Sequence, residues 1–251
     1  MIARRTLLRG GAGLLLAGCD RVLQVPAARR ILFAGEDMQR GLHRALTDRA
    51  ALAPEYRPDQ MSPVFRSNGT SNPNTPAYNA LAAGRFADWR LEVGGLVDRP
   101  LRLSLADLNA MPNRDQITRH DCVEGWSSIA KWSGARLGPL LARAGLRKDA
   151  KFIVFHCADD LDDSADGSGL YYESIDLVDA FHPQTILAYD MNDAPLPIQH
   201  GAPLRLRVER QLGYKHAKYV MRVEAVASLD AFGKGRGGYW EDRGYDWYAG
   251  V

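Results

Sequence analysis

The chain has 251 residues, of which 46% are hydrophobic, 25% are charged and 9% are aromatic. This is the composition of an ordinary globular protein, and the length is enough to bury one large core or two smaller ones. The net charge is +2, and it becomes −1 when the three arginines among the first eighteen residues are set aside. A nucleic-acid-binding protein needs a basic surface to offset phosphate charge, so the near-neutral body excludes that class.

The first eighteen residues have the layout of an export signal. Arg4 and Arg5 precede an apolar run at residues 10–17, which is too short to span a bilayer as a mature helix. The paired arginines resemble the twin-arginine motif, whose machinery exports proteins that have already folded. Leu16-Ala17-Gly18-Cys19 resembles a lipobox, in which the cysteine becomes the lipidated first residue. We therefore expect an export signal at 1–18, a lipid anchor at Cys19 and a location on the periplasmic side of the cytoplasmic membrane.

The alternative for this segment is an uncleaved signal-anchor in which Cys19 has no role. Export of a folded protein is required when a cofactor must be inserted before the membrane is crossed. The twin-arginine interpretation therefore predicts a bulky prosthetic group in the body of the chain.

Residues 19–56 are expected to form a connector with one amphipathic helix. Leu42, Leu46 and Leu52 fall on a helical spacing, which predicts a helix over Glu36–Ala53. The following stretch, residues 56–78, is rich in Pro, Asn, Ser and Thr and should be irregular.

From Trp89 onward, short strands alternate with short helices inside a predicted domain at 57–251. The expected helices are Leu105–Asn109 capped by Ser104, Leu137–Ala144 ended by Gly145, and Ile175–Phe181. The expected strands are 89–93, 117–122, 151–157, 185–191, 204–208 and 219–226. The glycine- and aromatic-rich segment 233–251 should wrap the surface. Because no run of βαβ units is present, the pattern predicts a β-rich α+β fold with mixed sheets and short helices.

The densest group of reactive side chains is Arg119-His120-Asp121-Cys122, followed by Glu124. A cysteine where a strand runs into a loop, beside Arg and His, can be held as a thiolate. A thiolate suits either nucleophilic attack or a soft transition metal. A buried, inert cysteine is the third interpretation, and the spacing does not choose among them.

Residues 122–127 (CVEGWS), followed by Trp132 and the Leu140–Leu141 helix, closely resemble the molybdenum-ligand segment of the sulfite oxidase family. The resemblance is greatest to the branch that contains the catalytic subunit of the periplasmic methionine sulfoxide reductase. Three further family-like segments follow in the same order: 199–205 (QHGAPLR), 213–218 (GYKHAK) and 244–250 (GYDWYAG). Four ordered matches make a specific signal, whereas one CVEGW motif alone would be weak.

The resemblance implies a sulfite oxidase-type fold around molybdenum held by molybdopterin, with Cys122 as the metal ligand. The other positions that match cofactor-binding residues of the family are Asn68, Cys157, His200, Arg205, His216, Ala217 and Lys218. Arginine offers a bidentate fork to a buried phosphate, and lysine offers a point charge. The chain departs from the family at Cys157, where threonine is usual, and at His216, where a small residue is usual.

The resemblance further implies transfer of an oxygen atom to or from a small, sulfoxide-like substrate. Electrons would pass singly to or from a membrane-bound partner, either a cytochrome or a quinone-linked protein. Three alternatives stay open. The enzyme could oxidise sulfite, Cys122 could act as a redox thiol with His120 or in a pair with Cys157, or the domain could be a binding module without the cofactor.

Overall fold

The computed structural model describes residues 26–162 and 169–251, and the side chains from residue 34 onward. The chain forms two units, one up to Asp48 and one from Arg49 to Val251. The predicted export signal and Cys19 lie outside the described residues. Within the described ranges, no helix combines the length and the apolar character that crossing a membrane would require.

The N-terminal unit contains helix α2, Pro26–Leu46, so the helix predicted over 36–53 was wrong at both ends. Residues 51–55 belong to the second unit and run extended, as a strap on that unit. The Gln184 side chain bonds the backbone N–H of Ala53 at 2.8 Å and its carbonyl at 3.0 Å. Pro54 disfavours helical conformation at Ala53, and α2 has already ended at Leu46.

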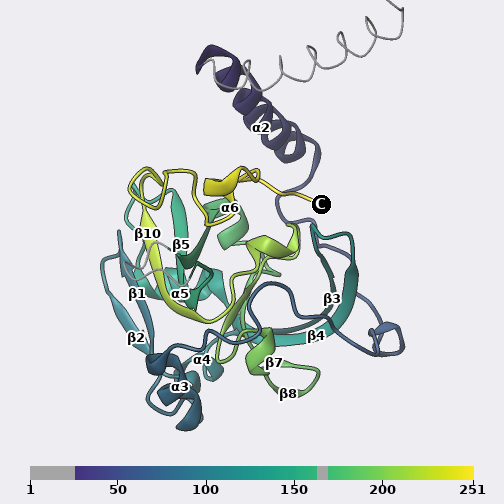
Figure 1. The fold of residues 1–251 in the computed structure, drawn as a ribbon, viewed down its shortest axis with the longest axis vertical. Helices are drawn as coiled ribbons and strands as arrows, with labels where there is room; N and C mark the ends of the chain where they lie inside the picture. The colour runs from purple at the N-terminus through teal and green to yellow at the C-terminus, as the bar shows by residue number, and fades with distance from the viewer. Residues whose placement is uncertain (1–25, 163–168) are drawn as a thin grey trace, which may run out of the picture. The chain divides into compact units, whose positions relative to one another are not determined.

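The second unit contains two five-stranded sheets, which Figure 1 shows with β1, β2, β5 and β10 in one and β3 and β4 in the other. The first sheet has the order β2 (Leu101–Leu103), β1 (Leu91–Gly95), β10 (Val220–Val226), β5 (Phe152–Asp160), β6 (Leu170–Asp176). The second has the order β3 (Asn113–Asp121), β4 (Ser127–Arg136), β7 (Ile186–Met191), β8 (Ala194–Pro195), with β9 (Arg205–Arg207) also paired to β7. The pairing is antiparallel except between β1 and β10. The predicted α+β class is confirmed.

The segment between β9 and β10 connects the two sheets. Leu206 of β9 donates its N–H to the carbonyl of Ala217 at 2.8 Å, and Val220 of β10 donates to the carbonyl of Leu204 at 2.9 Å. Residues 213–218 are therefore fixed between the sheets, where their side chains meet groups from both.

Short helices cover the edges of the sheets: α3 (Pro76–Ala83), α4 (Leu105–Asn109), α5 (Leu137–Ala144), α6 (Leu177–Ala180) and the 3-10 turns 58–60, 198–200, 213–215 and 241–243. The predicted bounds of α4 and α5 are confirmed. Ser104 caps α4 by accepting the Asp107 N–H at 3.1 Å, and Gly145 ends α5 with φ 72°. Both helices were predictable because their caps are local in sequence.

Other expectations need correction. The helix predicted over Ile175–Phe181 begins only at Leu177, because Ile175 pairs with Ile153 in β6 and Asp176 is the N-cap. The irregular stretch 56–78 includes the start of α3 at Pro76. Four strands, β2, β4, β6 and β8, were not predicted. The C-terminal segment does more than cover the surface, since Tyr239 and Glu241 are buried.

The β4–β7 pairing leaves no room for a side chain at Gly134. A Cβ there would lie 2.3 Å from the Leu187 carbonyl oxygen and 2.6 Å from the Ala188 Cα, both of them backbone atoms of β7. The strand register also shifts between Ser133 and Gly134.

We expect Gly134→Ala to lower the free energy of unfolding by about 3 kcal/mol, because relieving the overlap requires β7 to move. Urea denaturation of the purified chain measures this. Gly94→Ala in β1 is the matched control, since a Cβ there meets nothing within 4 Å, and its effect should stay within about 1 kcal/mol. Equal effects of the two substitutions would contradict the steric account.

Candidate functional site

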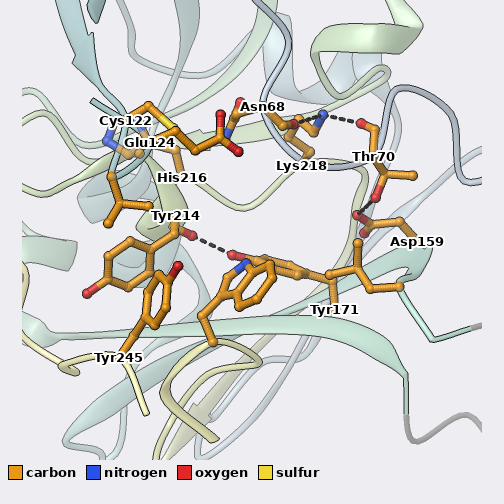
Figure 2. A pocket seen from close by; sticks show the side chains of 15 residues that line it. Asn68, Thr70, Cys122, Glu124, Asp159, Tyr171, Tyr214, His216, Lys218 and Tyr245 are labelled. Carbon is orange, nitrogen blue, oxygen red and sulfur yellow. Dashed lines mark hydrogen bonds between the residues drawn. The ribbon is translucent and has the colours of Figure 1, made fainter. Parts of the chain in front are cut away.

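A pocket of about 670 Å³, partly open to solvent, lies where the two sheets, the 213–218 segment and the C-terminal segment meet (Figure 2). Its lining residues are Asn68, Gly69, Thr70, Cys122, Val123, Glu124, Asp159, Leu161, Tyr171, Gly213, Tyr214, His216, Lys218, Trp240 and Tyr245. Cys122 follows β3 of one sheet, whereas Asp159 belongs to β5 of the other. The pocket therefore depends on the correct docking of both sheets.

Cys122 begins the tight turn that joins β3 to β4. Its N–H donates to the Trp126 carbonyl at 2.9 Å, and its carbonyl accepts the Gly125 N–H at 3.0 Å. Gly125 has φ 85°, a conformation that glycine adopts at little cost. The turn holds Cys122 half-buried at the pocket wall, which agrees with the predicted strand-to-loop position.

The neighbours expected to stabilise a Cys122 thiolate are engaged elsewhere. Arg119 pairs with Asp121 at 2.9 Å, and His120 contacts Arg207 at 3.0 Å. Burial, together with the charge of Glu124, raises the pKa of the Cys122 thiol. Arg119 and His120 therefore do not bond the Cys122 sulfur in this structure. A positive ion bonded to the sulfur would supply the stabilisation that the surrounding side chains do not.

Lys218 joins the two sides of the pocket. Its ammonium donates to the carbonyl oxygens of Asn68 at 2.6 Å and Gln199 at 3.2 Å, and also to that of Thr70. Burial, with the nearby charge of Arg205, lowers the pKa of Lys218 to about 7. Asn68, His216 and Lys218, three of the expected cofactor-binding residues, thus line the same pocket as Cys122.

The other predicted residues, Cys157, His200, Arg205 and Ala217, are buried outside the lining set. Arg205 reaches two of the segments involved, because its guanidinium donates to the carbonyls of His200 at 2.9 Å and His216 at 3.5 Å. Ala217 contributes the carbonyl that accepts Leu206, and Cys157 packs into the main core. These residues shape the pocket from behind.

Cationic side chains gather in this interior. The pKa values of His120, His200 and His216 are all lowered, chiefly by burial and further by Arg205 and other neighbouring positive groups, and that of His200 falls to about 4. Arg205 and Arg207 lie over the Trp132 ring, at 4.9 Å and 4.4 Å from its centroid.

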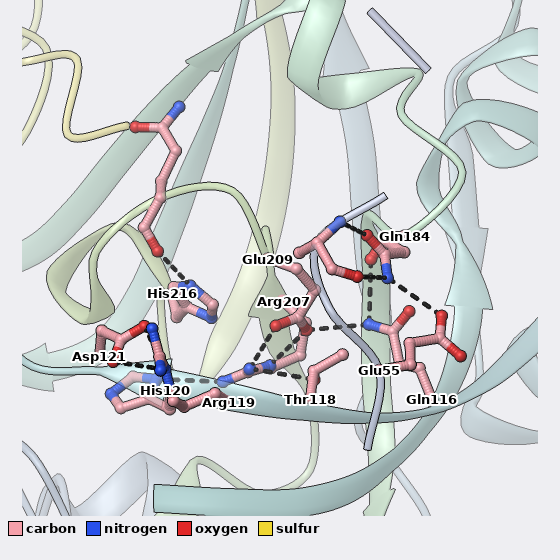
Figure 3. Close-up of polar contacts among 12 residues, drawn as sticks. Glu55, Gln116, Thr118, Arg119, His120, Asp121, Gln184, Arg207, Glu209 and His216 are labelled. Carbon is pink, nitrogen blue, oxygen red and sulfur yellow. Dashed lines mark hydrogen bonds and ion pairs between the residues drawn. The ribbon is translucent and has the colours of Figure 1, made fainter. Parts of the chain in front are cut away.

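One of the two arginines has a full counter-charge. Arg207 pairs with Glu209 at 2.6 Å and 2.8 Å, as Figure 3 shows. Among the residues that the structure describes, Arg205 has no carboxylate as a hydrogen-bond partner. Burial, followed by the charge of Arg207, lowers its pKa to about 9. The site therefore has a surplus of positive charge close to the pocket.

Two donors in this cluster have no acceptor within the described ranges, namely the buried nitrogens His120 Nε2 and Arg205 Nε. His216 Nδ1 is a buried acceptor without a donor there, because the neutral ring donates from Nε2 to the Gln211 carbonyl. A Cβ at Gly213 would lie 2.4 Å from His120 Nε2, so the glycine allows the His120 ring to pack directly against this backbone. Buried donors and cations of this kind fit an anionic group that brings phosphate oxygens. They fit the molybdopterin expected from the sequence.

The described parts of the chain contain no group of three His, Cys, Asp or Glu residues arranged to hold a metal ion. A metal in this pocket would take one sulfur from Cys122 and its remaining ligands from elsewhere. This ligand balance agrees with a metal carried by a pterin.

Sequence reasoning missed several lining residues. Asp159 lies two residues beyond Cys157 in β5, so the period-two alternation of a strand would have placed the two on one face. Tyr171 had no signal, because β6 was not predicted. Glu124 and Tyr245 lay inside the quoted motifs but were given no pocket role, and Trp240 lies just before the last of those motifs.

Comparisons with known proteins agree with the geometry. The family described as "Oxidoreductase molybdopterin binding domain" matches residues 78–230. A protein of Azospira oryzae, provisionally named protein-methionine-sulfoxide reductase subunit YedZ1, is 40% identical over 78% of this chain and 70% of its own length. The protein-methionine-sulfoxide reductase catalytic subunit MsrP of Xanthomonas axonopodis pv. citri is 34% identical over 58% of this chain.

The chain matches 47% of the length of that Xanthomonas protein, or about half. Among solved structures, the sulfane dehydrogenase SoxCD of Paracoccus pantotrophus covers 56% of this chain and 39% of its own, with 23% identity and a TM-score of 0.49.

Asp159 gives a prediction on pH. Burial raises the pKa of this carboxyl to about 6 from its ordinary 3.8, although Thr70 donates to it at 3.0 Å. The folded state thus holds the proton more tightly than the unfolded state. The stability that this provides is complete below pH 3.8 and is lost as the pH rises through about 6.

We expect Asp159→Asn to remove this loss. Without cofactor, the free energy of unfolding of the variant at pH 7 should exceed that of wild type by up to about 3 kcal/mol. Urea unfolding at several pH values measures the difference. Asp98→Asn, at an exposed position, is the control and should follow wild type. A gain that does not change between pH 4 and pH 7 would contradict the assignment to Asp159.

Proposed function

The chain belongs to the oxidoreductase molybdopterin-binding domain family, and from that membership we propose that it reduces a small, sulfoxide-like substrate by oxygen-atom transfer. The observation that carries the proposal is the position of Cys122. It lines a pocket, and buried donors without partners among the described residues and a cluster of positive groups lie next to that pocket. Both relatives described above are named for methionine sulfoxide reduction, which supports this direction of the reaction.

In this proposal Cys122 binds molybdenum through its sulfur. Asn68, His216 and Lys218 would contact the cofactor from the pocket lining, and the other expected residues, Cys157, His200, Arg205 and Ala217, are buried outside that lining and would support the site indirectly. Lys218, held by three backbone carbonyls, faces the pocket as the point charge, and Arg205 supports the loops of His200 and His216. When bound, the molybdenum–pterin group supplies the oxygen-atom transfer itself.

The reaction balances with two electrons and two protons. The sulfur–oxygen bond of the sulfoxide breaks, the sulfur is reduced to a thioether, and the oxygen leaves as water. Asp159 can take up and release a proton beside the pocket near neutral pH, because burial raises its pKa to about 6 and its Oδ1 has no hydrogen-bond partner among the described residues. An electron-transfer protein supplies the electrons one at a time.

We further propose that this electron donor is membrane-bound, either a cytochrome or a quinone-linked protein. Both relatives are named as subunits, which supports a partner protein. The export signal at 1–18 and a lipid on Cys19 would keep the domain near the periplasmic face of the membrane. Bacterial lipoproteins carry more than one acyl chain, and a single chain anchors only weakly.

Protein exported through its own signal should contain molybdenum and pterin, and it should reduce methyl sulfoxides with a chemical electron donor. Cys122→Ser should lose the metal and the activity, because a serine hydroxyl is a poor substitute for a thiolate ligand. Metal analysis, pterin fluorescence and sulfoxide reduction measure the three properties. Cys157→Ala should keep its molybdenum, since residue 157 does not line the pocket.

The same assays separate the alternatives. A thiol enzyme would retain activity without metal, and alkylation of Cys122 would abolish it. A cofactor-free binding module would contain no molybdenum even when produced with its own signal. Faster turnover of sulfite than of any sulfoxide would replace the proposed reaction by sulfite oxidation.

Lipidation is tested by metabolic labelling with palmitate. We expect label on the wild-type chain and none on Cys19→Ser, because the lipobox thiol is the attachment point. Cys157→Ser serves as the control and should be labelled normally. Equal labelling of wild type and Cys19→Ser would contradict the lipid anchor.

A further inference from the structure

One wall of the pocket comes from the C-terminal segment. Trp240 and Tyr245 are stacked, with ring centroids 5.4 Å apart and an interplanar angle of 26°, and Tyr214 packs edge-on against Tyr245 at 5.2 Å. All three residues line the pocket (Figure 2). Two of them lie far along the chain from Cys122, so this aromatic wall depends on whatever holds the segment 237–247 in place.

A buried charged cluster joins this segment to the rest of the fold. The Lys215 ammonium bonds the carboxyl of Glu173 in β6 and, at 2.5 Å, that of Glu241 in the C-terminal segment. The side chains of all three have no exposed surface. Lys215 comes directly before His216 in the pocket segment, and Glu241 directly follows Trp240 in the wall.

The charges of this cluster do not cancel when every group is ionised. Two carboxylates and one ammonium would leave a net negative charge in the interior, which is very costly. Burial and the neighbouring carboxyl of Glu241 raise the pKa of Glu173 well above its usual range. One proton is therefore retained by the two carboxyl groups, and the cluster is neutral.

Neutral hydrogen bonds add to this attachment. Ser174 of β6 donates to the Gly237 carbonyl at 2.5 Å and accepts from the Trp247 indole at 2.8 Å. Tyr172 donates to Asp242 at 2.6 Å. Alternate residues of β6 thus hold the start, middle and end of the segment, and Lys215 is the point where the segment also meets the cofactor-facing loop.

We propose that Glu173, Lys215 and Glu241 form a neutral clamp that positions the Trp240–Tyr245 wall, and that this wall selects substrates with a bulky group next to the reacting atom. These three are positioning residues, because their side chains are buried beneath the wall. The substrate part of the inference rests on the proposed sulfoxide reduction, whereas the clamp itself does not.

The test depends on the single proton that the carboxyl groups of Glu173 and Glu241 share. Glu173→Gln and Glu241→Gln each leave one carboxylate for Lys215, so the clamp stays neutral and amide hydrogen exchange across 237–247 should remain within about twofold of wild type. The double variant leaves Lys215 buried without a counter-charge. We expect it to exchange at least about tenfold faster there, with β1 and β10 unchanged.

Hydrogen exchange is measured by mass spectrometry on the full, cofactor-loaded chain, with exposed Glu92→Gln as the control. The clamp would be overturned if hydrogen exchange across 237–247 were no faster in the double variant than in the single variants. It would also be overturned if either single variant exchanged as fast there as the double variant. Should the double variant not fold, adding Lys215→Met removes the buried charge and should restore folded protein. Failure of this rescue would also overturn the proposal.

Steady-state kinetics test the wall. In the double variant the KM for a peptide containing methionine sulfoxide should rise about tenfold while kcat changes less than about threefold, and the KM for dimethyl sulfoxide should change little. Equal effects on the two substrates would overturn the selectivity. If the wild-type protein reduces no sulfoxide, the proposed function fails, and hydrogen exchange still decides whether the clamp exists.

Discussion

Positive charge that is buried without enough negative charge is the constraint on which this structure depends. Arg205, Arg207 and Lys218 lie close together behind and beside the pocket, among three histidines that burial keeps neutral, and Glu209 pairs directly with Arg207. Burial lowers the pKa values of Arg205, Lys218 and His216, and repulsion from neighbouring positive groups lowers them further. An anionic ligand would remove the repulsion, so binding of the cofactor and completion of the fold are coupled.

The cluster is held in place by the way the two sheets are joined. Segment 213–218 bonds to β9 on one side and leads into β10 on the other, so its side chains are fixed relative to both sheets. A series of hydrogen-bonded side chains connects this cluster to residues farther from the pocket. Glu209 accepts Gln116 at 2.9 Å, and Gln116 also donates to the Gln184 carbonyl at 3.1 Å. Gln184 in turn holds the strap at Ala53 (Figure 3).

The sequence predicted what is encoded locally or in ordered motifs. Helices α4 and α5 were predicted because Ser104 and Gly145 mark their ends. Cys122 was placed at the end of a strand, and Asn68, His216 and Lys218 lie around the same pocket. The α+β class and the family were likewise predictable, since four motifs in order are specific where each alone is weak.

What could not be predicted depends on distant partners. Strand β6 is defined by its pairing with β5, and no pattern within residues 170–176 indicates that it carries Glu173 toward Lys215. The contacts of the two residues before Cys122 could not be predicted for the same reason. Arg119 and His120 are adjacent in sequence, but their own partners, Asp121 and Arg207, direct them away from the sulfur. Neighbours along a chain do not reveal which competing contact is stronger.

The aromatic wall also sets the order in which the protein can mature. The pocket needs residues from Asn68 to Tyr245, so it cannot exist on a polypeptide still being synthesised until residue 245 has left the ribosome. Before then, the region around Cys122 lacks its Trp240 side and is more open than in the finished fold. A prosthetic group that contacts the whole pocket can therefore be enclosed only after translation has passed residue 245.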